Sequence, residues 1–170
     1  TVQKTAGAVT LTSQSKLTTA GALGNVSSPP TFTVENVAAG TGSITVVGIT
    51  EVSASSTGNQ LVFDYQATGS LGGGELKLTV PSGWTAPQAT TLGAAGYETA
   101  ASTGGSVGTL TVSGQDVVIP VTSLEADQTV RVRYGSGSGS SGAQAQGITG
   151  YANFEFSTKG KTGDDGDEFA

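Results

Sequence analysis

The sequence predicts an all-β protein, an immunoglobulin-like antiparallel β-sandwich with a detached N-terminal strand. Gly, Ser and Thr supply 72 of the 170 residues, and only 12% of the residues are charged. The β-branched residues Val and Thr favour a pleated, half-buried surface over a helix. Segments of alternating polarity recur about every 8–12 residues between Gly, Asn or Ser, and this spacing is typical of a sandwich or barrel.

The expected strands of the sandwich lie between residues 32 and 159. Each is a short run of apolar or alternating residues with turn residues on both sides. They are 32–38, 43–54 with a break or bulge at Gly48, 60–68, 75–80, 97–102, 107–113, 116–123, 128–135 and 148–159. No segment has the periodicity of a convincing helix.

Alternation along four of these segments assigns one face of each strand to the core. Period-two patterning of this kind predicts antiparallel sheets with one buried and one exposed face. The residues expected to point inward are Leu61, Phe63, Tyr65, Ala67, Leu76, Leu78, Val80, Val130, Val132, Tyr134, Phe154 and Phe156.

Both ends of the chain differ from this body. Residues 1–12 are extended-looking and rich in Thr, Val and Ala, whereas 13–31 form a turn-rich linker that Pro29-Pro30 closes. The sandwich is expected over 32–159. Residues 160–170 form an acidic tail, which leaves the two ends as the candidates for contacts with other molecules.

The composition argues against an enzyme. The chain has no His and no Cys, so the commonest general base, the thiolate nucleophile and the usual ligands of zinc, copper and haem iron are missing. Residues 104–108 fit the pattern G-x-S-x-G, but a nucleophile elbow needs a His that this chain lacks. We therefore expect no catalytic residues and no cofactor.

Two weak sites remain as alternatives. One is a calcium site in the acidic tail, since Ca²⁺ binds several carboxylate oxygens, although a solvated tail explains the same residues. The other is N-glycosylation at Asn25, which begins an Asn-Val-Ser sequon in the linker. The calcium candidates are Asp164, Asp165, Asp167 and Glu168.

The charge and the hydropathy of the chain limit the classes of partner that it is expected to bind. The net charge is −6, and no basic stripe exists that could displace counterions from nucleic acid. No apolar run approaches the roughly 20 residues that span a bilayer. The chain begins at Thr1 and contains no Met, which we interpret as a processed, secreted chain.

The single tryptophan, Trp84, follows Val80 and Pro81 in a turn. Flat rings bind carbohydrate faces well, so Trp84 with Tyr97 and Tyr134 could form a stacking surface for a glycan. Trp84 could instead plug one end of the sandwich core.

Three stretches of the chain carry recognisable motifs: GELKLTVPSGWTAPQ at 74–88, VSGQDVVIPVTSLEADQTVRVRYGSGSG at 112–139 and NFEFSTKGK at 153–161. They resemble modules of secreted prokaryotic surface proteins, the largely uncharacterised immunoglobulin-like repeats of adhesins and fibres. In these modules one strand ends in Val-Pro-Ser-Gly-Trp, a later strand ends in Tyr-Gly-Ser-Gly, and the last strand carries Phe-x-Phe-x-Thr-Lys. The resemblance covers about residues 60–160 and implies a cell-surface location.

A second, architectural resemblance is to donor-strand pilins and camelysin-like matrix fibres, in which a detached segment completes the sheet of the next subunit. Main-chain hydrogen bonds then supply affinity, and alternate side chains fill pockets. This resemblance implies a filament or surface-layer subunit that binds other copies of itself through Val2, Ala6, Ala8, Val9 and Leu11. Two alternatives stay open: the N-terminal strand pairs within its own chain, or the protein is an adhesion module that binds surface glycans.

Overall fold

The computed structural model describes residues 42–136 and 141–160, together with the backbone of four short strands between residues 7 and 34. All regular structure in these residues is β-strand, and every strand pair in a sheet is antiparallel. The chain divides into two compact units, Thr1–Asn36 and Val37–Ala170.

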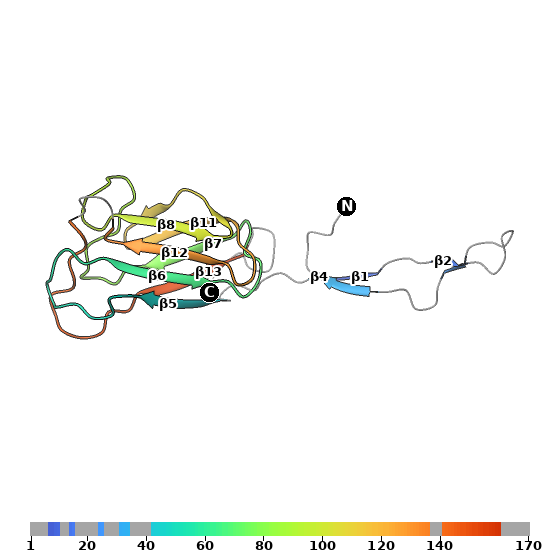
Figure 1. The fold of residues 1–170 in the computed structure, drawn as a ribbon, viewed down its shortest axis with the longest axis horizontal. Helices are drawn as coiled ribbons and strands as arrows, with labels where there is room; N and C mark the ends of the chain where they lie inside the picture. Colours follow the sequence, from blue (N-terminus) through green and yellow to red (C-terminus); the bar gives the residue numbers. More distant parts are fainter. Residues whose placement is uncertain are drawn as a thin grey trace. The chain divides into compact units, whose positions relative to one another are not determined.

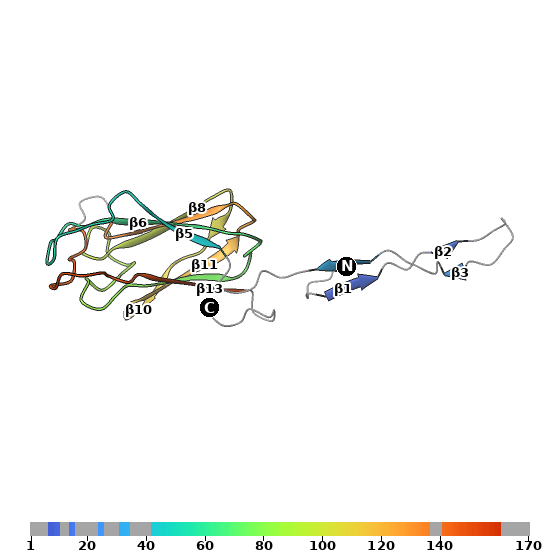
Figure 2. The same ribbon diagram turned by 90° about the horizontal axis from the view of Figure 1, so that it is seen from below.

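The second unit contains two sheets packed face to face, so the predicted all-β sandwich is confirmed. Figure 2 shows the two layers, with β5, β6 and β8 in one and β10, β11 and β13 in the other. The first sheet has four strands in the order β5 (Ser43–Val47), β6 (Leu61–Gln66), β12 (Thr129–Tyr134) and β8 (Glu98–Thr103).

The second sheet has five strands. Its main path runs β10 (Thr111–Ser113), β11 (Asp116–Ser123), β7 (Glu75–Thr79) and β13 (Glu155–Lys159), and β9 (Ser106–Val107) also pairs with β11. In the first sheet β5 and β8 form opposite margins (Figure 1). Within the part of the chain that the structure describes, β5 is therefore hydrogen-bonded to a neighbouring strand on one side only.

The core lies between the sheets and consists mainly of the residues predicted from alternation. Leu76, Leu78, Val130, Val132 and Tyr134 are fully buried. Phe154 and Phe156 are half-buried, and both rings pack on Phe63 at centroid distances of 5.4 and 5.2 Å. The faces of the predicted strands are therefore correct.

Several strand boundaries differ from the expectation. The segment that begins at residue 43 ends at Val47, because Gly48 takes a positive φ of 86° and breaks the strand where a break was expected. Residues 107–113 contain parts of two strands rather than one, and residues 148–154 precede β13 without being a strand.

The first unit, which we call the arm, contains two short antiparallel ladders. Strand β1 (Gly7–Thr10) pairs with β4 (Thr31–Val34), and β2 (Gln14–Ser15) pairs with β3 (Gly24–Asn25). The sequence had assigned 32–38 to the sandwich and 13–31 to a linker, but β4 pairs with the N-terminal strand, and the linker range contains the second ladder. Within the described residues the N-terminal strand is therefore half of a hairpin.

Candidate functional site

Two of the three rings that were expected to form a glycan-stacking surface, Trp84 and Tyr134, are buried. Trp84 is 8% exposed and Tyr134 is fully buried, and their ring centroids lie 6.3 Å apart in the core. Phe154 packs edge-on against Trp84 at 5.1 Å. The neighbours that bury these rings occupy the faces a sugar would need, so the position of Trp84 fits the other interpretation, a plug at one end of the sandwich core.

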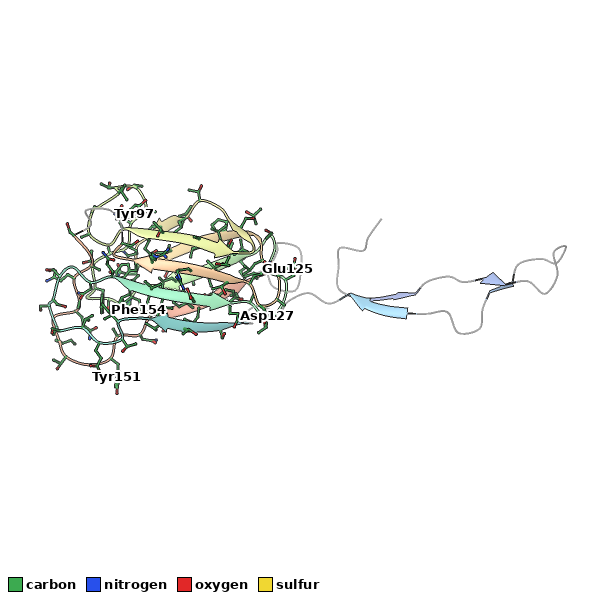
Figure 3. The ribbon with its side chains drawn as sticks, viewed as in Figure 1. Tyr97, Glu125, Asp127, Tyr151 and Phe154 are labelled. Carbon is green, nitrogen blue, oxygen red and sulfur yellow. The ribbon has the colours of Figure 1, made fainter. Side chains whose placement is uncertain are left out.

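The third ring, Tyr97, is half-buried and lies just before β8. Its main chain forms an isolated bridge with Gln88. Figure 3 shows Tyr97 and the exposed Tyr151 at opposite margins of the sandwich. The tyrosines thus do not extend one flat surface.

The predicted interface residues fall in or near the arm. Ala8 and Val9 belong to β1, where they pair with Thr33 and Phe32. Asn25, the glycosylation candidate, belongs to β3 and pairs with Gln14. Lying outside the described residues are Val2, Ala6, Leu11 and the calcium candidates Asp164, Asp165, Asp167 and Glu168.

A site that the sequence did not reveal lies at the β5 edge. Residues directly opposite in an antiparallel ladder share a face of the sheet. Val46 pairs with Phe63 and Ile44 pairs with Tyr65, so all four belong to the core-facing side. Phe63 and Tyr65 are each 3% exposed, whereas Val46 is 43% and Ile44 is 37% exposed. The opposing sheet therefore covers β6 and leaves β5 uncovered.

An open groove of about 680 Å³ continues from this uncovered face. We call it the β5 groove. Leu61, Phe63, Trp84 and Phe154 contribute its apolar inner surface, and all four pack in or against the core. The residues that follow β5 and the residues that precede β13 supply its sides. The groove is thus the unfilled margin of the hydrophobic core.

Exposed apolar side chains gather around this groove. Among the described residues, four of the seven large hydrophobic residues that are exposed line it, and two more, Ile44 and Val47, lie on β5. The four are Val46, Ile49, Ile148 and Tyr151. Apolar residues concentrated at one place on a surface mark an interaction site more often than scattered ones do.

The chemistry of the groove suits binding rather than proton transfer. Glu51 is the only charged residue among those that line it. Across residues 42–136 and 141–160, no three His, Cys, Asp or Glu side chains gather into a set that could hold a metal ion. What the groove offers is apolar surface beside a strand edge that still has backbone hydrogen-bonding groups to share.

An ion pair lies on the outer face of the first sheet. Arg131 donates two hydrogen bonds of 2.7 Å to the two carboxylate oxygens of Asp64, its cross-strand partner. The hydrogen bond from Arg131 lowers the pKa of Asp64 below its ordinary value. This pair lies on the face opposite the core.

One buried acid lies at the other margin of the same sheet. Glu98 is 1% exposed, and neither of its carboxylate oxygens has a hydrogen-bond partner among the residues that the structure describes. Burial raises its pKa to about 8, so the carboxyl group is mostly protonated at neutral pH. Its cross-strand partner is Tyr134, whose hydroxyl donates to the carbonyl oxygen of Thr85. Burial, and to a smaller extent the charge of Glu98, raises the pKa of Tyr134.

No protein-family model matches the chain, and no curated protein or solved structure is significantly similar to it. The sandwich architecture rests on the structure itself, and the immunoglobulin-like kinship stays a prediction. The described residues include no helix long and apolar enough to cross a membrane.

Proposed function

We propose that the protein is a structural subunit of an extracellular filament or surface layer, which polymerises head to tail when the N-terminal strand of one copy completes a sheet of another. The observation that carries the proposal is the uncovered β5 edge. A stable sandwich normally protects its edge strands, and an exposed apolar edge is a template for pairing with another chain.

The arm supports the same proposal from the other side of the contact. In the described residues of Thr1–Asn36, the only ladders are two-stranded. A lone two-stranded ribbon is marginally stable in water, and it gains stability from a third strand or a packed surface. The chain therefore has one unit whose described ladders are two-stranded and another unit with an open edge.

The expected polymer follows from the symmetry of such a contact. An arm that binds a different surface on the next copy makes a heterologous interface, and such an interface extends without limit unless the rotation closes a ring. The composition suits durable extracellular material, since Thr and Val fill sheet surfaces, Gly and Ser fill loops, and oxidation-prone Cys and Met are absent.

The test compares the wild type, a truncated variant and a point variant by electron microscopy and by light-scattering mass in solution. The wild type is expected to form filaments or sheets, whereas a variant without residues 1–12 is expected to stay monomeric. Leu92→Asp is the matched control, because Leu92 is 63% exposed and does not line the β5 groove. Normal filaments from the truncated variant would exclude strand donation.

The alternative proposal, an adhesion module for surface glycans, has less support. Of the three rings it relied on, only Tyr97 is more than marginally exposed. It still predicts that glycans change the fluorescence of the single tryptophan, and a flat response across a broad glycan panel would count against it.

A further inference from the structure

We propose that the receiving site for the arm is the β5 edge together with the β5 groove, and that its occupant is strand β1 of a second copy of this chain. The inference rests on the proposed function and names the two surfaces that meet. In the joined state β1 would lie beside β5 and extend the first sheet from four strands to a larger, intermolecular one.

The first argument is that β5 lacks the usual protection of an edge strand. Natural edges carry charges, prolines or bulges, or are covered by another segment. The β5 sequence is Ser-Ile-Thr-Val-Val, with no charge and no proline, and all five residues are exposed. The neighbouring edge of the second sheet is different, because β13 begins with Glu155 and ends with Lys159.

The second argument is the chemistry of the groove beside β5. A strand added to β5 would place alternate side chains on the core-facing side of the sheet. There they would meet Val46 and Ile49 at the margin and Phe63 beneath them. Apolar side chains would bury surface on Val46 and Ile49, which are 43% and 52% exposed, at the margin that the second sheet leaves uncovered.

The third argument concerns the occupant. In the arm, the ladder couples Val9 to Phe32 and Gly7 to Val34, whereas the intervening pairs are Ala8 with Thr33 and Thr10 with Thr31. Apolar residues thus concentrate at one set of register positions, the pattern of a strand with one buried face. The described residues of the arm provide no second layer to cover that face.

Length and charge agree with this pairing. Strand β1 has four residues and β5 has five, so the two edges match. The arm contains Lys4 and Lys16 against one acid, Glu35, whereas the whole chain has a net charge of −6. A slightly positive arm is therefore attracted to a strongly negative body, and the groove itself carries the acid Glu51.

Connectivity distinguishes a second copy from the same chain. Strand β4 leads directly into β5 through residues 35–42. If the arm folded back on its own sandwich through this short connection, β4 would lie next to β5 and β1 would lie outside it. In the proposed contact, β1 of a second copy lies next to β5. The strand that lies next to β5, either β1 or β4, therefore distinguishes a second copy from the same chain.

The experiment uses the absence of cysteine in the chain. Thr45→Cys places one thiol on β5, and four separate variants place one on β1 at Gly7, Ala8, Val9 or Thr10. Each β1 variant is mixed with the β5 variant, assembled and oxidised, and the products are separated on a non-reducing gel. Disulfides need Cα atoms about 4.4–6.8 Å apart, so they form only between true neighbours.

We expect a disulfide-linked dimer for at least one β1 position and none when Ala101→Cys replaces Thr45→Cys. Ala101 is the matched control, because it is exposed on β8, the opposite margin of the same sheet. Dimers from Thr45→Cys alone would show that β5 pairs with itself. A double variant with cysteines in β4 and β5 that closes a disulfide within one chain would show a folded-back arm. Either result would overturn the inference.

A charge in the groove gives an independent test. Val46→Lys should lower the polymerised fraction at least about tenfold, because an edge lysine blocks strand pairing, while Ala101→Lys should leave it unchanged. Native Trp84 emission establishes that each variant is folded. If Val46→Lys does not fold, the disulfide cross-links described above provide the test instead. Undiminished polymer from folded Val46→Lys would overturn the receiving site but leave the proposed function standing. A wild type that stays monomeric would overturn the proposed function itself.

Discussion

Strands β12 and β5 flank the same strand, β6, and have similar alternating sequences, yet one is central to the fold and the other is not. In β12, Val130, Val132 and Tyr134 are fully buried. In β5, Ile44 and Val46 occupy the same face of the sheet and are more than a third exposed. The difference teaches that alternation determines which face a residue occupies, whereas the extent of the opposing sheet determines whether that face is covered.

The largest expected effect on stability concerns Glu98, the buried acid of β8 that lies opposite Tyr134 of β12. Because the pKa of Glu98 is about 8 in the folded protein, the folded state binds a proton that the unfolded state has released above about pH 4.5. The free energy of unfolding should therefore fall as pH rises from about 4.5 to 8, by up to about 5 kcal/mol, and then level off. Urea unfolding at a series of pH values measures this slope.

The control for this prediction is Glu98→Gln. It keeps the shape of the side chain and cannot ionise, so the stability loss between pH 5 and 8 should shrink strongly. If wild type and variant lose stability in parallel, other groups cause the loss and the Glu98 carboxyl is not the buried acid that the structure indicates.

The next largest effect tests directly whether β12 and β5 differ in how far they are buried. Val132→Ala removes buried methyl groups from β12 and leaves a cavity, so it should cost about 2 kcal/mol. Val46→Ala removes the same atoms from β5, where 43% of the residue is already exposed, and should cost less than about 0.5 kcal/mol. Urea midpoints with unchanged m-values measure both changes. Equal costs would mean that β5 is covered in the isolated subunit.

These two strands also show how far the sequence could predict the fold. Alternation correctly predicted that Leu61, Phe63 and Tyr65 point into the core. Trp84 had two interpretations, and its burial agrees with the one in which it plugs the core. The sequence of β5 alternates in a similar way, yet its core-facing residues Ile44 and Val46 are exposed. Coverage depends on where a sheet ends relative to its partner, and a local pattern carries no information about that.

The arm and the groove were missed for related reasons. Strand β4 has the composition of a sandwich strand, and only the pairing of Val9 with Phe32 shows that it belongs with the N-terminal strand. The groove joins residues 46–63 with Trp84 and residues 145–154, which are far apart in the chain. The one available signal was the five-residue β5 run with neither charge nor proline.

A smaller effect is expected on the outer face of the sheet, where β12 meets β6. Asp64→Ala removes the two hydrogen bonds from Arg131, and because that side chain is 43% exposed the loss should be only about 0.5–1 kcal/mol. Since the hydrogen bond from Arg131 lowers the pKa of Asp64, its contribution is present at neutral pH. It should disappear as pH falls below the ordinary carboxyl pKa, the opposite direction to the Glu98 effect.

A double-mutant cycle with Arg131→Ala isolates this pair. The coupling energy should persist at pH 7 and vanish in strong acid, and a coupling that is the same at both pH values would show that charge is not its source.

The smallest expected effect on stability is the sharpest test of what the β5 residues are for. Val46→Thr keeps the shape and the strand preference of the side chain, and the added hydroxyl remains in contact with water, so stability should change by less than about 0.5 kcal/mol. The same change at Val132 buries a hydroxyl among apolar neighbours and should cost about 1–3 kcal/mol if no partner is found. Calorimetric melting of the two variants gives the comparison. If Val46→Thr folds like the wild type yet assembles less, then Val46 serves the contact between copies, because a residue that serves only the fold would change stability and assembly together.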